Sequence, residues 1–161
     1  MLIGVLSDTH IPRRSKSLPP ILWKGLEGVD LILHAGDINQ PDLLDELGLI
    51  APVHAVLGNT DPYELQIKLP LTKVLQLGRF KVGLVHGDGI GGRTVDRAAQ
   101  AFQRPDLDIV IFGHSHQPYC AFHGKTLFFN PGSPTDKRIM PYYSYGLIRL
   151  EEEIKAELIC F

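Results

Sequence analysis

The sequence predicts an α/β fold built around parallel strands. Its first 61 residues contain three runs of apolar residues that each end in small and polar side chains, at residues 2–8, 30–37 and 52–61. A continuous apolar run suits a strand that is covered on both faces. Short helical patterns separate the three runs, and strands that alternate with helices favour parallel pairing through right-handed crossovers.

Two short helices are expected between these strands. The first covers residues 20–26. The second covers residues 41–49, PDLLDELGL, where Pro41 suits the first turn and Leu43, Leu44 and Leu47 share one face. Each helix would lead from the end of one strand to the start of the next.

The second half of the chain continues this pattern and adds antiparallel pairing. Residues 73–87, KVLQLGRFKVGLVHG, read as two strands around a turn at LGRF. Residues 93–103 form the clearest helical pattern, because apolar residues recur there at the i, i+3, i+4 and i+7 spacing of one helix face.

The remaining strands are expected near the C-terminal end. Apolar runs at residues 107–116 and 125–133 predict two of them. Residues 143–150 and 154–161 would form a hairpin across the acidic turn at residues 151–153.

We expect a single domain that covers residues 1–161. The length lies in the usual range for one domain, and 44% hydrophobic residues suffice for a sizeable core. No internal repeat, low-complexity tract or long linker divides the sequence. The net charge of -2 and the even spread of charged residues provide no basic field, which argues against nucleic acid as an electrostatic partner.

The protein is expected to be soluble and cytoplasmic, without a membrane partner. The N-terminal apolar run LIGVL is too short for the core of a signal peptide, and no other stretch approaches the length of a membrane span. Cys120 and Cys160 lie far apart and form no C-x-x-C pair. We therefore expect two reduced thiols, both buried.

The residues that follow the strands point to a metal site. The segments LSDTH, HAGDI, LGNTD, LVHGD and IFGHSH each place Asp, His or Asn within a few residues of a strand end. In open α/β sheets, ligands bind at the carboxyl edge of the strands. The candidate metal ligands are Asp8, His10, Asp37, Asn59, His86, His114 and His116.

Each of these short patterns also has a plain structural explanation when it is taken alone. Asp8 could cap a turn, Gly-Asp and Gly-Asn are ordinary turn sequences, and a lone His86 would more often be a core histidine. Five strand ends that all carry such residues at one edge favour a shared role. Seven oxygen and nitrogen ligands exceed one tetrahedral zinc site but suit two metals that share a bridging carboxylate.

These motifs resemble, in order and spacing, those of the calcineurin-like metallophosphoesterases. They are D-x-H at Asp8, G-D at Gly36, G-N at Gly58, H-G at His86 and G-H-x-H at Gly113. The short length and the NPGS sequence at residues 130–133 are similar to the compact bacterial and archaeal phosphodiesterases of that family. The resemblance spans residues 2–133 and implies a four-layer αββα sandwich, with two mixed β-sheets flanked by helices.

The resemblance also implies how the ligands divide between two divalent metal ions. One ion would be held by Asp8, His10 and His116 and the other by Asn59, His86 and His114, with Asp37 as the bridge. Manganese is the metal that we expect first, with nickel, zinc, iron and cobalt as alternatives that ligand softness does not separate. No organic cofactor is expected.

The expected activity is that of a phosphodiesterase acting on a small phosphoester. Two divalent cations about 3.5–4 Å apart can hold a phosphate and the oxygen that attacks it in line. A hydroxide that bridges the metals would be available near neutral pH, because metal binding lowers the pKa of water from about 15.7 to about 7. Neutral imidazoles leave net positive charge at the site to attract the anionic substrate.

Two positions depart from the pattern of many relatives. Thr60 stands where a histidine often protonates the leaving group, and a hydroxyl is a poor general acid at neutral pH. We therefore expect slow turnover of poor leaving groups, and the general acid is not identified. Asp88 replaces a second histidine and would repel a monoester more than a diester. Asp61 is a candidate for orienting the ligands, with a plain turn role as the alternative.

Other readings of the sequence lead to different functions. The segment GDGIGG at residues 87–92 fits a dinucleotide-binding pattern, but Gly113 and His114 stand where that fold needs an acidic residue. The competing function is a protein-interaction scaffold, since the family that the chain resembles includes a scaffold subunit of retromer. Relatives of this compact type also form dimers or larger assemblies, so a homo-oligomer is a further expectation.

Overall fold

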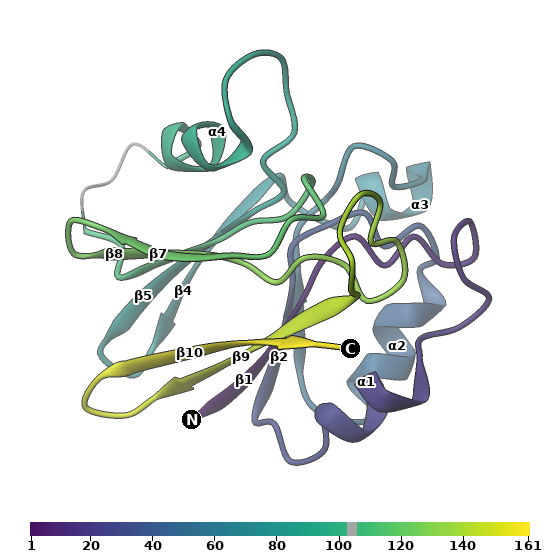
Figure 1. Cartoon of the computed structure of the whole chain (residues 1–161), viewed down its shortest axis with the longest axis horizontal. Helices are drawn as coiled ribbons and strands as arrows, with labels where there is room; N and C mark the ends of the chain where they lie inside the picture. Colours follow the sequence, from purple (N-terminus) through teal and green to yellow (C-terminus); the bar gives the residue numbers. More distant parts are fainter. Residues whose placement is uncertain (103–105) are drawn as a thin grey trace.

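Two mixed five-stranded sheets pack face to face in the computed structural model, which describes residues 1–102 and 106–161 (Figure 1). The strands of the first sheet are, in spatial order, β10 (Ile154–Cys160), β9 (Ser144–Leu150), β1 (Leu2–Leu6), β2 (Leu31–His34) and β3 (Val53–Ala55). Those of the second sheet are β4 (Thr72–Leu77), β5 (Phe80–Val85), β6 (Ile109–Ile111), β8 (Thr126–Asn130) and β7 (Tyr119–His123). The helices are α1 (Pro20–Gly25), α2 (Asp42–Gly48), α3 (Tyr63–Gln66) and α4 (Thr94–Gln100).

The three predicted parallel strands are confirmed as the centre and one edge of the first sheet. β1 pairs with β2 and β2 with β3 in parallel, while β9 joins β1 antiparallel. In the second sheet β6 is parallel to both of its neighbours, β5 and β8. The carboxyl ends of β1, β2, β3, β5, β6 and β8 therefore reach the same end of the sandwich.

Among the residues that the structure describes, three hydrophobic cores hold the four layers together. The central core lies between the sheets, where Val5 and Leu33 of the first sheet meet Leu84 and Phe129 of the second. A second core packs the outer face of the first sheet against α1 and α2, and a third packs α4 against the second sheet. The predicted αββα sandwich of two mixed sheets is thus confirmed.

The predicted hairpins are also present. β4 and β5 pair antiparallel across a turn that contains Gly78, and Leu77 faces Phe80 at its start. β9 and β10 pair along their full length across the acidic turn, where Leu150 faces Ile154. The glycine at the first turn has a positive φ of 59°, which other residues adopt at a steric cost.

Several element boundaries differ from the prediction. The helix expected over residues 93–103 is α4, which ends at Gln100, and residue 103 lies outside the described residues. Phe102 still packs on the third core from beyond the helix end, so the apolar spacing continued farther than the helix does. α3 and β7 were not predicted, because a four-residue helix and a strand with little apolar alternation leave no clear pattern.

The expectation that both cysteines are buried is wrong. Cys120 and Cys160 are free and exposed. Cys120 lies on β7 and Cys160 on β10, and these are edge strands of the two sheets. Side chains of a strand point alternately to the two faces of its sheet, and those of Cys120 and Cys160 point to a side that the protein does not cover.

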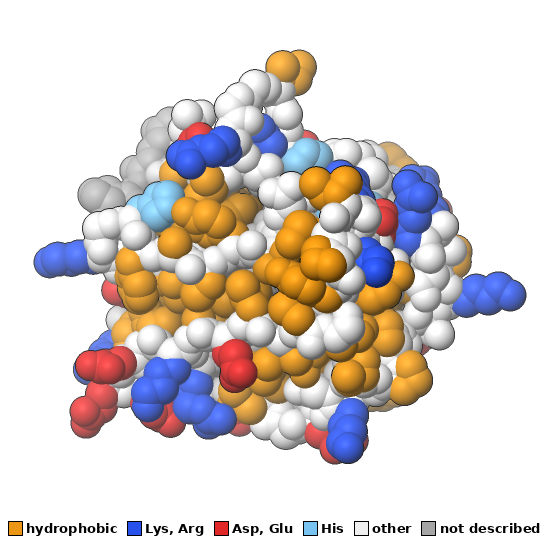
Figure 2. Space-filling model, viewed as in Figure 1, with side chains coloured by type: hydrophobic (Ala, Val, Ile, Leu, Met, Phe, Trp, Pro, Cys, Tyr) orange, Lys and Arg blue, Asp and Glu red, His pale blue; other side chains and the backbone are white. Residues whose placement is uncertain are grey.

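Hydrophobic side chains cross the middle of the face shown in Figure 2, between the regions that Figure 1 labels β7 and β10. The two edge strands are in contact there, which closes the sandwich on this side. None of the helices in the described part of the chain has the length and hydrophobicity of a membrane-crossing segment.

Candidate metal centre

All seven predicted ligands lie together at the carboxyl end of the sandwich. The structure forms two groups whose potential ligand atoms lie within 4.8 Å of one another. The groups are Asp8, His10 and His116, and Asp8, Asp37 and His86. Asn59 joins the second group through its side-chain oxygen, which lies 3.1 Å from Nε2 of His86 and 3.1 Å from Nδ1 of His114.

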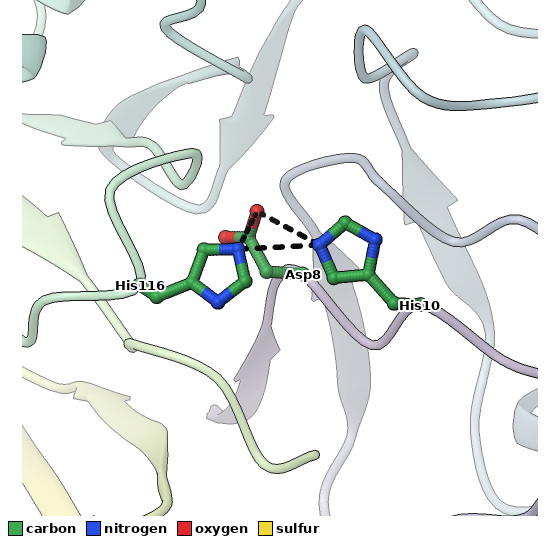
Figure 3. Close-up of side chains that lie close together, drawn as sticks. All are labelled: Asp8, His10 and His116. Atoms are coloured by element: carbon green, nitrogen blue, oxygen red, sulfur yellow. Dashed lines mark hydrogen bonds and ion pairs between the residues drawn. The ribbon is translucent and has the colours of Figure 1, made fainter. Parts of the chain in front are cut away.

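The first group forms one half of the site. In it Asp8 and His10, the two ends of the D-x-H motif, lie beside His116, the last histidine of the G-H-x-H motif (Figure 3). Nε2 of His10 and Nε2 of His116 lie 3.2 Å apart, and the two rings stack with their centroids 5.1 Å apart. Oδ1 of Asp8 lies 3.4 Å from Nε2 of His116 and 3.9 Å from that of His10. Potential ligand atoms from the two ends of the D-x-H motif and from a histidine more than 100 residues away thus face one point.

Asp37 connects the two halves. Its Oδ2 lies 3.6 Å from Nε2 of His10 and 3.4 Å from Nε2 of His86. Its Oδ1 accepts a hydrogen bond from the backbone N–H of Thr60 at 2.9 Å. Burial works against the charged form, but His86 and Thr60 outweigh it and hold the pKa of Asp37 below the ordinary 3.8.

The carboxylates create a strong preference for positive charge at His86. Burial would lower its pKa, but the hydrogen bond to Asp37 and the charges of Asp8 and Asp37 raise the pKa of His86 to about 9. Its Nδ1 donates to the carbonyl oxygen of Ala35 at 2.7 Å, so Nε2 is the atom that faces the carboxylates. A proton and a cation would compete for that nitrogen.

His116 presents an unprotonated nitrogen to the site. Its Nδ1 faces the carbonyl oxygen of Asp136, which can only accept, so the ring proton is on Nδ1. Burial lowers the pKa of His116, which keeps the ring neutral. Nε2 therefore directs a lone pair toward Asp8 and His10.

Asp8 provides the test of whether a cation fits here. Its Oδ2 accepts hydrogen bonds from Oγ of Ser7 at 2.7 Å and from the N–H of His114 at 2.9 Å. Its Oδ1 is buried and has no hydrogen-bond partner, alone among the buried side-chain oxygen and nitrogen atoms of the described residues. A buried carboxylate oxygen beside a lone pair is costly unless positive charge lies between them. The donor set fits a divalent cation.

The backbone at the site adopts a conformation that is uncommon outside glycine. Positive φ angles between 45° and 65° occur at five of the seven predicted ligands: Asp8, His10, Asp37, His114 and His116. The left-handed region is disfavoured for residues with a Cβ and concentrates at functional sites. The tight turns after the strands thus aim the side chains inward.

Two motif glycines are required by close packing. A Cβ on Gly58 would lie 2.1 Å from the backbone nitrogen of Asp37, and a Cβ on Gly113 would lie 1.8 Å from Oγ of Ser7. Both distances are far below any van der Waals contact. Gly58 therefore lets the turns after β2 and β3 approach within the first sheet, and Gly113 lets the turn after β6 of the second sheet approach the end of β1.

The NPGS segment supports the first half of the site from behind. Oγ of Ser133 donates to the carbonyl oxygen of Asp8 at 2.8 Å, and Nδ2 of Asn130 donates to that of Gly113 at 2.8 Å. Oγ1 of Thr135 donates to the carbonyl oxygen of Thr9 at 2.6 Å. The sequence showed the motif but not these roles, because they depend on contacts between segments that lie 17 to 126 residues apart.

The carboxylate of Asp61 holds the backbone of the G-D turn. Its carboxylate accepts N–H groups of Asp37, Ile38, Asn39 and Gly58 at distances from 2.7 to 3.2 Å. Burial raises the pKa of Asp61, and the hydrogen bonds from Asn39 and Gly58 partly offset this. The candidate orienting residue thus fixes the turn that carries Asp37.

The glycine-rich segment GDGIGG is not arranged as a phosphate cradle. Arg97 of α4 donates to the carbonyl oxygens of Gly87, Gly91 and Gly92 at 2.8–3.0 Å. The loop therefore directs carbonyl groups toward a guanidinium, whereas a phosphate needs N–H donors.

A sandwich of two mixed sheets with a carboxylate and imidazole cluster at its strand ends defines a metal-binding α/β protein. A family model described as the calcineurin-like phosphoesterase superfamily domain matches residues 1–153, and the chain belongs to this family. The sequence is 38% identical over 160 residues to a "Probable metallophosphoesterase" of Methanothermobacter thermautotrophicus, which covers 99% of this chain and 92% of the relative.

Solved structures are similar along the whole chain. Vps29 of Entamoeba histolytica, solved in complex with zinc, is 28% identical, with a TM-score of 0.78 and coverage of 99% of both chains. An archaeal phosphodiesterase is 22% identical with a TM-score of 0.75, covering 99% of this chain and all of that one. At that identity the second comparison shows the fold alone.

Proposed function

We propose that this protein is a phosphodiesterase that works with two divalent metal ions. One ion would be held by Asp8, His10 and His116. The other would be held by Asn59, His86 and His114, and Asp37 would contribute to both. The observation that carries the proposal is Oδ1 of Asp8, which is buried, has no hydrogen-bond partner and faces Nε2 of His116.

The division into two ions is supported by the position of Asp37. Its Oδ2 is nearly equidistant from a nitrogen of each half, at 3.6 Å from His10 and 3.4 Å from His86. One carboxylate oxygen between ligand nitrogens of the two groups is the arrangement expected of a bridging ligand, because it offsets the repulsion between two cations.

When bound, divalent ions supply charge that attracts the phosphate and lower the pKa of the water that attacks phosphorus. The residues of this chain hold and orient the site around that chemistry. Backbone carbonyls fix the rings of His86 and His116, and the left-handed turns point the ligands inward. His114 is half-buried and lies at the solvent side of the cluster, where substrate would enter.

Thr60 supports a preference for esters with good leaving groups. Its hydroxyl accepts a hydrogen bond from Nδ2 of Asn39 at 2.8 Å and lies 3.4 Å from Nδ1 of His10. The group at the position of the usual general acid is therefore hydrogen-bonded to Asn39 and lies beside the ligand His10. A leaving group that departs as a stable anion needs no proton, so we expect faster cleavage of such diesters.

The test combines metal content with hydrolysis. The purified protein is stripped with a chelator, titrated with manganese, nickel or zinc, and assayed with bis(p-nitrophenyl) phosphate. We expect two equivalents of metal to bind and hydrolysis to return with the metal. His86→Asn is the matched variant, which should lose hydrolysis while the fold is retained.

The competing function is a protein-interaction scaffold of the same fold. The likeness to Vps29, at 28% identity over the whole chain, is the observation that favours this alternative. A protein that binds no metal at micromolar concentration, or that binds two ions and cleaves no phosphoester, would favour the scaffold over the enzyme.

A further inference from the structure

Asn39 follows the bridging carboxylate by two residues and reaches back into the site. It has a positive φ of 67°, and its backbone N–H donates to Oδ1 of Asp61 at 2.8 Å. Its half-buried side chain lies between Thr60 and His10. Nothing in the motif pattern of the sequence singles out this residue.

The contacts of Asn39 determine which way its amide points. Nδ2 lies 2.7 Å from the carbonyl oxygen of Thr60 and 2.8 Å from its hydroxyl oxygen. A carbonyl oxygen can only accept, so the amide nitrogen must face Thr60. The flipped amide would place two acceptor oxygens at 2.7 Å. Oδ1 of Asn39 is therefore the atom that faces Nδ1 of His10, at 3.0 Å.

The amide in turn determines the tautomer of His10. Because Oδ1 can only accept, Nδ1 of His10 must carry the proton that joins them. In the neutral ring Nε2 then has no proton. That nitrogen faces Nε2 of His116 at 3.2 Å and Oδ2 of Asp37 at 3.6 Å, at the centre of the site.

We infer that Asn39 is a positioning residue that holds His10 with its Nε2 free to bind a cation, and that Thr60 serves as the anchor of Asn39. The inference rests on the proposed function. The rings of His86 and His116 are oriented in the same way by the backbone carbonyls of Ala35 and Asp136. Of these three imidazoles, His10 alone depends on a side chain, so a single substitution can alter its orientation.

Two variants separate this role from a merely structural one. Asn39→Gly removes the amide, and glycine adopts the left-handed backbone without strain. Asn39→Asp keeps an acceptor for the ring N–H, since a carboxylate is a common partner of a metal-bound histidine, but it replaces the amide nitrogen that donates to the carbonyl oxygen of Thr60. We expect Asn39→Gly to weaken the binding of one of two manganese ions by about 10–100-fold, and Asn39→Asp to recover part of that loss because it keeps the acceptor for His10 but not the donor to Thr60.

The tautomer of His10 is measured directly in the metal-free protein by two-bond ¹H–¹⁵N NMR correlations. The wild type and Asn39→Asp should show the proton on Nδ1, while Asn39→Gly should show a mixture of tautomers. A wild-type His10 that carries its proton on Nε2 would overturn the inference, as would unchanged tautomer and affinity in Asn39→Gly. A wild type that binds no manganese would overturn the proposed function instead, and the NMR result would still decide the role of Asn39.

Discussion

Oδ1 of Asp8 faces Nε2 of His116 at 3.4 Å, although the carboxylate and the imidazole nitrogen are both acceptors. Removing the carboxylate charge should therefore abolish the main attraction for a cation. We expect Asp8→Asn to bind manganese more than 100-fold less tightly, beyond the roughly 10–100-fold effect of outer partners. Asparagine tolerates the left-handed backbone at this position, so the metal-free fold should persist.

The measurement is thermal and chemical unfolding with and without manganese. A ligand at 100 times its dissociation constant raises the free energy of unfolding by about 2.7 kcal/mol. The wild type should gain this amount for each bound ion and lose it on chelation. An equal gain in Asp8→Asn would contradict the assignment of Asp8 as a ligand.

Asp37 should control how many cations bind. Asp37→Asn removes the charge that lies between the two halves and retains the left-handed turn. We expect isothermal titration to show one manganese ion bound with altered affinity and the second weakened by roughly tenfold or more. Two ions bound with wild-type affinity would show that Asp37 does not bridge them.

Gly113 should tolerate no side chain. In Gly113→Ala the new Cβ would overlap Oγ of Ser7, which must move and takes Asp8 with it. We expect a loss of about 1–3 kcal/mol in the free energy of unfolding, with loss of metal binding. Gly48→Ala is the matched control, since its Cβ would meet nothing within 4 Å, and it should stabilise the protein by up to about 1 kcal/mol. Similar stability of the two variants would argue against close packing at Gly113.

Asp88 should set the preference between diesters and monoesters. Its charge acts on His114, which lies at the exposed side of the site, so it is near enough to act on a bound phosphate. Removing the negative charge should favour the doubly charged monoester. We expect Asp88→His to lower the ratio of diester to monoester kcat/KM, with Asp88→Asn intermediate. An unchanged ratio would refute this role.

His34 should make the protein sensitive to acid. Burial, first of all, lowers the pKa of His34 from 6.5 to about 3. Below pH 6.5 the unfolded chain binds a proton that the folded protein cannot, so the free energy of unfolding falls by up to about 1.4 kcal/mol per pH unit toward pH 3. In His34→Gln, measured by urea denaturation with chelator present, this slope should be shallower between pH 6.5 and 4.5. Parallel profiles would show that His34 does not contribute.

The sequence predicted those elements of the fold that have a strong local pattern. The apolar strands and the polar residues at their ends predicted the parallel centre of the fold and the convergence of seven side chains. The turn residues of β4–β5 and β9–β10 predicted the hairpins. These features are local, and the fold class constrains how they assemble.

The features that the sequence did not predict depend on contacts between distant segments. Asn39 gains its role because the turn after β2 meets the turn after β3 and brings the amide to Thr60. Ser133 reaches Asp8 across 125 residues. The exposure of Cys120 depends on which face of β7 the rest of the protein covers, and that is not encoded in local spacing. Side-chain partners of this kind have no periodic signal.

The left-handed turns at Asp8, His10, Asp37, His114 and His116 have an evolutionary consequence. Each costs of order 1 kcal/mol relative to a relaxed backbone, so the site lowers the stability of the molecule that carries it. A descendant released from selection for metal binding would gain robustness by replacing these positions with glycine or asparagine. Substitution by those residues at these positions would therefore indicate a lineage that has lost metal binding but has kept the fold.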